Sequence, residues 1–261
     1  MNSRINQNKQ NYCSFAEWSQ TSLGQSLFAT EKHALSKYLP ALKGNIAVQY
    51  GYAGTSPMLE MSDIESKFFL LASDGSETEA VSSNDFAGMQ ALYVNSGSVL
   101  PFTSSSVDLC LLPHMLDFAD DPYQLLRESK EILVSGGHLA ILGFNPYSLW
   151  GGRKLFSRKQ APWNSHNFSV YKVRDWLSLL DFHISGGMML YYSPPTQSQS
   201  WRERFNFMED AGDRWWPMLA SAYLLIAQKR DQGMTVIDFR ESFKKNNFAN
   251  VTEPVAKSHL K

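Results

Sequence analysis

The sequence predicts an α/β fold in which helices cover a doubly wound, mostly parallel sheet. Two observations support this prediction. Short apolar runs alternate with helical patterns from residue 45 to residue 143, and the run at 107–113 (VDLCLLP) is apolar almost throughout, as in a strand buried on both faces. A length of 261 residues accommodates one such domain with insertions.

The elements of the first half follow in order along the chain. A helix is predicted over 21–39, where leucine and phenylalanine recur at helical spacing and Pro40 ends the pattern. The run at 45–50 predicts the first strand, GYAG at 51–54 predicts a turn, and a helix is expected to begin around Pro57. The runs at 67–72 and 92–95 predict the second and third strands, with SDGS as the turn after the second.

The second half begins with the fourth strand at 107–113. A helix over 121–133 starts at Asp121 and Pro122, and the Gly136-Gly137 pair separates it from a fifth strand at 138–143. A helical and aromatic insertion follows, with a polar and aromatic stretch at 145–168 and predicted helices at 170–180 and 200–216. Strands at 182–192 and 221–229 then complete a sheet of seven strands.

These elements form a single predicted domain over residues 1–240. Its core lies at about 21–145, and insertions at about 146–220 cover the substrate side. The segment 241–261 is polar with few apolar residues, so we expect a tail without fixed structure. No internal repeat is apparent.

Composition and charge exclude several classes of protein. No apolar run approaches the roughly 20 residues that cross a bilayer, and residues 1–10 lack the apolar centre of a secretory signal, so a cytoplasmic protein is expected. The net charge is −1 with both signs dispersed, which gives no footprint for nucleic acid and favours a small-molecule partner. Cys13 and Cys110 form no C-x-x-C pair, so neither a disulfide scaffold nor a metal site is predicted.

The residues that follow each strand are the candidates for ligand binding, because open α/β sheets bind ligands at the carboxyl ends of their strands. Gly51 and Gly54 follow the first strand and would let a ligand approach the backbone, although a simple tight turn would use them equally well. Asp74 lies twenty residues after Gly54, where a carboxylate commonly binds the hydroxyls of a ribose. The alternative for Asp74 is a helix N-cap.

One block of sequence resembles a known family. It contains Leu100-Pro101-Phe102, then Val107-Asp108-Leu109, and a strand ending in PHMLDF at 113–118, followed by a helix, a glycine pair and a fifth strand. This order and spacing are similar to the central block of the type 11 methyltransferases, and the segment 143–151 resembles one bacterial branch of that family. The resemblance covers about 49–230. It implies S-adenosylmethionine as cofactor and a Rossmann-like methyltransferase fold whose last strand is antiparallel.

The resemblance also implies roles for individual residues. Gly51 and Gly54 match the glycine loop under the cofactor, and Asp74 matches the acid that binds its ribose. Ser96 and Gly97 match the positions beside the adenine, and Pro113 and His114 match those facing the methionine part and the sulfonium. Gln49 and Ser96 stand where the family usually has acids, and the loss of a charge-assisted hydrogen bond at each place would weaken binding by about 1 to 3 kcal/mol.

Methyl transfer is an in-line displacement and requires alignment more than a dedicated catalytic group. His114 is the candidate base if the acceptor needs one, with Asp117 to orient it, but a structural or cofactor-facing histidine is the favoured alternative. The aromatic residues Trp150, Trp163, Tyr171, Trp201, Phe205, Trp215 and Trp216 would either roof a substrate site or fill core between helices.

Three functions remain from the sequence. The first is a methyltransferase that acts on a small or medium acceptor without strong charge. The second is a non-catalytic relative with a weakened pocket that serves as a binding or regulatory module. The third is a nicotinamide-dependent oxidoreductase, which ranks last because Tyr52 and Ala53 replace the second glycine of G-x-G-x-x-G. The acceptor, the atom methylated and the oligomeric state are not specified by the sequence.

Overall fold

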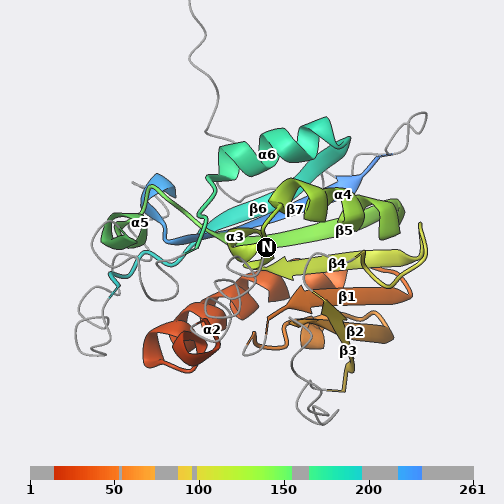
Figure 1. Ribbon diagram of the computed structural model, residues 1–261, viewed down its shortest axis with the longest axis horizontal. Helices are drawn as coiled ribbons and strands as arrows, with labels where there is room; N and C mark the ends of the chain where they lie inside the picture. Colours follow the sequence, from red (N-terminus) through yellow and green to blue (C-terminus); the bar gives the residue numbers. More distant parts are fainter. Residues whose placement is uncertain are drawn as a thin grey trace, which may run out of the picture.

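The computed structural model describes residues 15–52, 55–73, 88–95, 99–154, 165–195 and 217–230. These residues form one seven-stranded sheet in the order β3-β2-β1-β4-β5-β7-β6 (Figure 1). The predicted doubly wound α/β architecture is confirmed. The strands are β1 (Ile46–Gly51), β2 (Ser66–Ser73), β3 (Gln90–Asn95), β4 (Val107–Pro113), β5 (Leu133–Phe144), β6 (Phe182–Leu190) and β7 (Ala222–Lys229).

The pairing of the strands places the switch point of the sheet between β1 and β4. Strands β1 to β5 are parallel to one another, and β1 is hydrogen-bonded to β2 on one side and to β4 on the other. Strand β7 lies antiparallel between β5 and β6, which confirms the antiparallel last strand. The carboxyl ends of β1 and β4 therefore meet where an open α/β sheet binds its ligands.

The helices begin at the residues that can cap them. The hydroxyl of Thr21 accepts from the amide of Gly24 at the start of α2 (Ser22–Ser36), and a carboxylate oxygen of Asp121 accepts from the amide of Gln124 at the start of α4 (Pro122–Ile132). Ser169 caps α6 (Val170–Leu179) in the same way. The two short helices are α3 (Met115–Phe118) and α5 (Leu149–Lys154).

Two sequence-based boundaries were wrong. Helix α2 ends at Ser36, and the chain then makes a turn of 3-10 helix, η1 (Leu39–Ala41), around Pro40. The Gly136-Gly137 pair lies inside β5, because α4 leads directly into that strand; a Cβ at Gly137 would lie 3.0 Å from the Val134 carbonyl oxygen. The β4–β5 register shifts there, between Val107 and Leu109.

The largest departure from the prediction lies between β1 and β2. No α-helix begins at Pro57, and residues 55–65 contain a single turn of 3-10 helix, η2 (Leu59–Met61). The Gln49 side chain accepts from the Met58 amide and donates to the Ser56 carbonyl, which is the group that would accept the first hydrogen bond of a helix beginning at Pro57. This crossover is therefore held by a side chain from β1.

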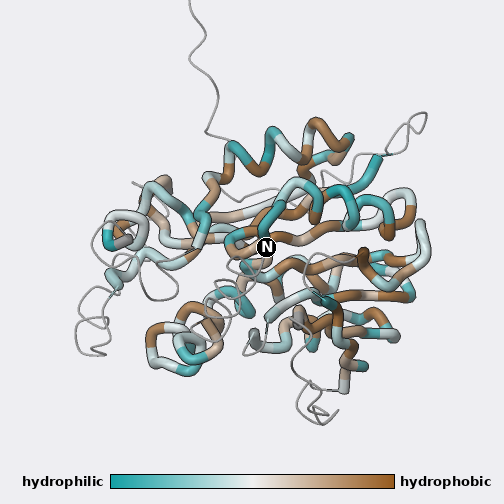
Figure 2. The backbone as a smooth tube through the Cα atoms, in the orientation of Figure 1, coloured by the Kyte–Doolittle hydropathy of each residue, from teal (hydrophilic) through white to brown (hydrophobic). Residues whose placement is uncertain are grey.

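The hydrophobic core follows the middle of the sheet. Hydrophobic residues concentrate along the central strands, and hydrophilic residues colour much of the outer side of α4 (Figure 2). Cys110 on β4 is fully buried, and burial raises the pKa of its thiol to about 12, as expected for an inert core cysteine. In the described ranges no helix is long and apolar enough to cross a membrane. The predicted helix at 200–216 and tail at 241–261 lie outside the described residues.

Candidate functional site at the carboxyl edge of the sheet

Gln49 is buried at the end of β1 with both ends of its side-chain amide engaged. Its Nε2 donates to the Ser56 carbonyl oxygen over 2.8 Å, and its Oε1 accepts from the Met58 amide over 2.8 Å. An amide side chain suits this pair of partners, because it donates at one end and accepts at the other. Gln49 thus fixes the course of the chain after β1, and the role of direct cofactor contact stays a prediction.

Gly51 ends β1 beneath the loop that Gln49 holds. A Cβ at Gly51 would lie 3.1 Å from three side-chain atoms of Thr55, and the Thr55 hydroxyl accepts from the Tyr52 amide over 3.1 Å. The side chain of Tyr52 is buried, and its ring lies 5.8 Å from that of Phe118, which follows β4. The glycine lets the loop fold closely over the strand end, and the two strand ends share a boundary of aromatic rings.

His114 follows Pro113 at the end of β4 in an unusual backbone conformation. Its φ angle is 55°, a left-handed value that non-glycine residues seldom adopt, and its amide donates to the Leu142 carbonyl oxygen over 2.9 Å. This conformation turns the chain sharply from the strand into α3. Backbone strain of this kind costs about 1 to 3 kcal/mol and persists where surrounding contacts fix it.

The contacts that fix His114 come from two buried carboxylates. Its Nε2 lies 2.9 Å from Oε1 of Glu31 on α2, and its Nδ1 lies 3.1 Å from Oδ2 of Asp117 on α3. The same Asp117 oxygen accepts from the amide of Phe144 over 3.0 Å. None of the three charged side chains is exposed to solvent. We call these three residues, Glu31, His114 and Asp117, the buried ion cluster.

The electrostatics of the buried ion cluster favour an imidazolium. Burial alone would lower the pKa of His114, but the charges and hydrogen bonds of Glu31 and Asp117 outweigh it, and the pKa rises to about 9. With both ring nitrogens donating to carboxylates, His114 has no free lone pair at neutral pH. This environment favours the structural or ligand-facing role over that of a general base.

Aromatic rings surround the buried ion cluster and exclude water from it. The imidazole of His114 stacks on Phe144 with ring centroids 4.1 Å apart, and Phe15 and Phe28 lie 6.0 and 6.3 Å away. Trp18 and Trp150 extend this shell, and the Trp150 indole donates to the Ser193 carbonyl. Trp150 belongs to the predicted aromatic set and is buried, whereas Tyr171 is partly exposed on α6.

Some buried polar atoms around the aromatic shell have no hydrogen-bond partner within the described part of the chain. They include Oε2 of Glu31, Nε1 of Trp18 and the hydroxyl of Tyr223. Burial and the charge of Asp117 raise the pKa of Tyr223 well above its ordinary value. Unpaired buried groups are uncommon, so each indicates a place where another group can bind or where the fold tolerates a cost.

The structure brings together only part of the predicted site. Gln49, Gly51, Pro113 and His114 lie at the carboxyl ends of the neighbouring strands β1 and β4. Other predicted site residues lie outside the described residues: Gly54, Asp74, Ser96 and Gly97. Among the aromatic candidates, the same holds for Trp163, Trp201, Phe205, Trp215 and Trp216.

Sequence reasoning missed Glu31, although a signal was present. Leu27, Glu31 and Leu35 stand four residues apart, so the acid occupies the apolar stripe of α2. A carboxylate on such a stripe is almost never fully buried unless it is paired, which points to a partner elsewhere in the fold. The partner could not be named without the topology, because it lies 83 positions along the chain.

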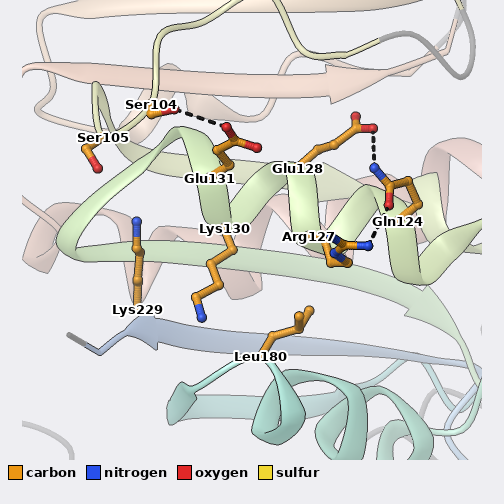
Figure 3. A pocket seen from close by; sticks show the side chains of 9 residues that line it. All are labelled: Ser104, Ser105, Gln124, Arg127, Glu128, Lys130, Glu131, Leu180 and Lys229. Atoms are coloured by element: carbon orange, nitrogen blue, oxygen red, sulfur yellow. Dashed lines mark hydrogen bonds between the residues drawn. The ribbon is translucent and has the colours of Figure 1, made fainter. Parts of the chain in front are cut away.

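A hollow of about 450 Å³ lies at the opposite edge of the sheet (Figure 3). Its charged side chains are largely satisfied by neighbours: Lys130 pairs with Asp181 over 3.0 Å, and Ser104 donates to Glu131 over 3.2 Å. Across 15–52, 55–73, 88–95, 99–154, 165–195 and 217–230, no cluster of three or more side chains could hold a metal ion. The candidate site is therefore the carboxyl edge at β1 and β4, not this hollow.

Comparison with known proteins supports the family resemblance. The sequence model of the type 11 methyltransferase family, described as a methyltransferase domain, matches residues 58–141. The chain is 37% identical over 145 residues to the uncharacterized protein YafS of Escherichia coli K12. That match spans 55% of this chain and 57% of YafS, so the chain covers little more than half the length of this relative.

Solved structures with the same fold include one from an archaeon and one from a bacterium. One belongs to the complex of the Haloferax volcanii Trm112 methyltransferase activator with a methyltransferase; it is 18% identical, covers 83% of this chain and 98% of its own, and has a TM-score of 0.61. The other is an S-adenosylmethionine-dependent methyltransferase of Thermotoga maritima, 16% identical over 82% of this chain and 94% of its own, with a TM-score of 0.55. The chain has the class I methyltransferase fold.

Proposed function

We propose that this protein is an S-adenosylmethionine-dependent methyltransferase that acts on a small or medium acceptor without strong charge. The observation that carries the proposal is the match of residues 58–141 to a methyltransferase domain, on a sheet whose β1 and β4 ends meet at the switch point. The water-free aromatic surroundings of the β4 end support the same conclusion, because methyl transfer needs an aligned, dry site.

The described residues fit this cofactor in two respects. Gly51 lets the backbone of the loop approach the strand end, and the stacked ring of Phe144 helps to exclude water from the end of β4. When bound, the cofactor supplies an electrophilic methyl group on a sulfonium. The turn after β1 and the turn after β4 are the segments that would hold it.

The protein's own residues contribute positioning in this proposal. The buried ion cluster fixes the turn that follows Pro113, and the rings of Phe15, Phe144 and Trp18 exclude water from it. His114 holds its proton between two carboxylates instead of removing one from the acceptor. An acceptor that is nucleophilic without a base suits this arrangement.

The absence of a helix between β1 and β2 bears on the alternatives. A pyrophosphate in dinucleotide-binding folds rests on a helix N-terminus that follows the glycine loop. Residues 55–65 provide only the turn η2. This favours a cofactor without phosphates over a nicotinamide dinucleotide.

The lack of an α-helix in residues 55–65 is also compatible with a second candidate function, a non-catalytic module with the methyltransferase fold. Both polar groups of the Gln49 side chain bind the backbone of the loop, which leaves them occupied. The turn η2 stands where a helix usually follows the glycine loop of a cofactor site. In this case a partner or effector would bind at the carboxyl edge, and methyl transfer would not occur.

The test is a calorimetric titration of the purified protein with S-adenosylmethionine and S-adenosylhomocysteine, with NADH as a control ligand. Micromolar binding of the adenosyl compounds, without binding of NADH, is expected for the methyltransferase. Absence of binding at millimolar concentration would contradict the cofactor and leave the non-catalytic module as the better account.

Two matched variants locate the site. Gly51→Trp places a ring against Thr55 under the loop and should abolish binding, whereas a Cβ at Gly152 meets nothing within 4 Å, so Gly152→Trp should bind normally. Thermal unfolding of both variants separates loss of the site from loss of the fold. Equal binding by the two variants would show that the ligand lies elsewhere.

A further inference from the structure

The N-terminal part of the chain joins the carboxyl edge through one buried ion pair. Helix α2 precedes the first strand, and its Glu31 carboxylate reaches His114 at the end of β4. Residues 15–19, also helical, contribute Phe15, whose ring lies 6.0 Å from His114 and 4.9 Å from Phe118. A segment outside the sheet thus closes over the candidate site.

The chemistry of this contact differs from the rest of the α2 packing. The other buried residues of α2 are mainly apolar and pack without direction, whereas Glu31 and His114 form a charge-assisted hydrogen bond of 2.9 Å between fully buried groups. Such a bond fixes both partners in orientation. Removing one partner leaves the other charged and buried, which is strongly destabilising, and we call this contact between Glu31 and His114 the clamp.

The far side of His114 connects this clamp to the sheet. Nδ1 lies 3.1 Å from Asp117, and Asp117 accepts from the Phe144 amide at the end of β5. The line from α2 through the imidazole to β5 is therefore continuous. His114, in the middle of this line, has the strained backbone that turns the chain from β4 into α3.

We propose that Glu31 is a positioning residue for the candidate site, clamping helix α2 and the turn after β4 together through the imidazole of His114. This proposal rests on the proposed function for the identity of the ligand, since it assigns Glu31 a part in shaping the cofactor site. Glu31 acts through His114, and the closed clamp sets the position of the turn that follows Pro113.

The groups that face the imidazole determine how the clamp responds to pH. They are Glu31 from α2 and Asp117 from α3, and the charge of Asp117 also acts on the buried hydroxyl of Tyr223 on β7. The remaining neighbours are the rings of Phe15, Phe28 and Phe144. Because only the imidazole carries positive charge in this group, its deprotonation would leave two carboxylates without a counter-ion and remove the charge-assisted contact between α2 and the turn after β4.

The experiment compares the full-length protein with the variants Glu31→Gln and Glu31→Asp. The control is Glu60→Gln, which breaks the partly exposed pair between Lys32 of α2 and Glu60 of η2, with nitrogen and oxygen 3.5 Å apart. Two measurements are made from pH 6 to pH 10: the NMR titration of the His114 ring, and calorimetric affinity for S-adenosylhomocysteine.

In the wild type and in Glu60→Gln, we expect the imidazolium to persist at neutral pH and the affinity to fall as His114 loses its proton. Glu31→Gln should lose the imidazolium at neutral pH and bind S-adenosylhomocysteine about 10-fold more weakly. Its affinity should no longer vary over the titration of His114. Glu31→Asp should retain most of the imidazolium and most of the affinity. A merely structural glutamate would not change the pH profile of binding.

The possible outcomes separate this proposal from the proposed function. Wild-type affinity in Glu31→Gln at every pH would overturn the positioning role, even if the His114 titration moves. If the wild type binds no adenosyl compound, the proposed function fails, and the clamp is still judged by amide exchange at 115–118. Faster exchange there in Glu31→Gln than in Glu60→Gln supports the clamp, and equal exchange refutes it. If Glu31→Gln does not fold, the wild type decides: an affinity for S-adenosylhomocysteine that falls as His114 loses its proton supports the clamp, and an affinity that is constant from pH 6 to pH 10 overturns it.

Discussion

A glutamate at position 49, where the type 11 methyltransferases that the sequence resembles usually carry an acid, should destabilise this protein. Gln49→Glu replaces the donor Nε2 with an oxygen that faces the Ser56 carbonyl, in a fully buried position. An ionised carboxylate there cannot donate, so two oxygens would repel each other without water. The protonated acid can still donate to Ser56 and accept from Met58, which resembles the wild-type arrangement.

The magnitude follows from the protonation of the introduced carboxyl. Full burial raises the pKa of a carboxyl by about 3 from an ordinary value of about 4.3, and each unit corresponds to about 1.4 kcal/mol. The unfolded chain ionises first as pH rises, so the cost begins near pH 4 and grows until the folded carboxyl ionises near pH 7. Gln49→Glu should therefore lose about 1 kcal/mol at pH 5 and about 4 kcal/mol at pH 8.

Urea unfolding of the variant and the wild type at pH 5 and pH 8 measures this difference. Gln49→Leu is the matched control, because it leaves the Met58 amide and the Ser56 carbonyl unpaired at both pH values. It should cost about 2 to 4 kcal/mol at each pH. A Gln49→Glu cost that is the same at pH 5 and pH 8 would refute the assignment of a donor to this position.

Three further predictions concern the packing around the site. The pKa of His114 rises from 6.5 to about 9, so its protonation contributes up to about 3 kcal/mol to the free energy of unfolding. This contribution is complete below pH 6.5 and disappears as pH rises through 9. Urea midpoints measured from pH 6 to pH 10 would show the loss, and a flat profile would contradict it. Tyr223→Phe removes a buried hydroxyl without a hydrogen-bond partner among the described residues and should leave stability unchanged or raise it by about 1 kcal/mol in thermal unfolding; a clear loss would mean that the hydroxyl has a partner. Asp108→Ala removes the acceptor for the amides of Asn45 and Ile46, two hydrogen bonds that hold the start of β1 against β4. The free energy of unfolding should fall by about 2 kcal/mol in thermal unfolding, and a fall of less than about 0.5 kcal/mol would contradict this role.

The fold could be predicted because its signals are local. The buried run of β4, the Asp121 and Pro122 start of α4 and the apolar spacing of α2 each reflect the position of a side chain on its own element. The boundaries that failed depend on distant residues. The helix expected at Pro57 is absent where a side chain from the preceding strand takes over the backbone hydrogen bonds.

The candidate site was predictable in place and only partly in composition. Position after β1 and β4 identified Gln49, Gly51, Pro113 and His114, because parallel strands end at a common edge. The partners of His114 were harder to foresee. Asp117 lies three residues after His114, so the sequence alone makes it a candidate partner of the imidazole. Glu31 belongs to a helix that precedes the sheet, and only the folded topology brings it near His114.

The connection from β1 to β2, whose residues 55–65 contain no α-helix, also offers a place for engineering. Longer connections cost little in chain entropy, about 0.6 kcal/mol for each doubling of loop length. The stretch around the turn η2 is therefore a natural position to insert a designed helix. Such a graft would add an aligned row of amide dipoles at the end of the sheet, and helix N-termini of this kind bind anionic ligands.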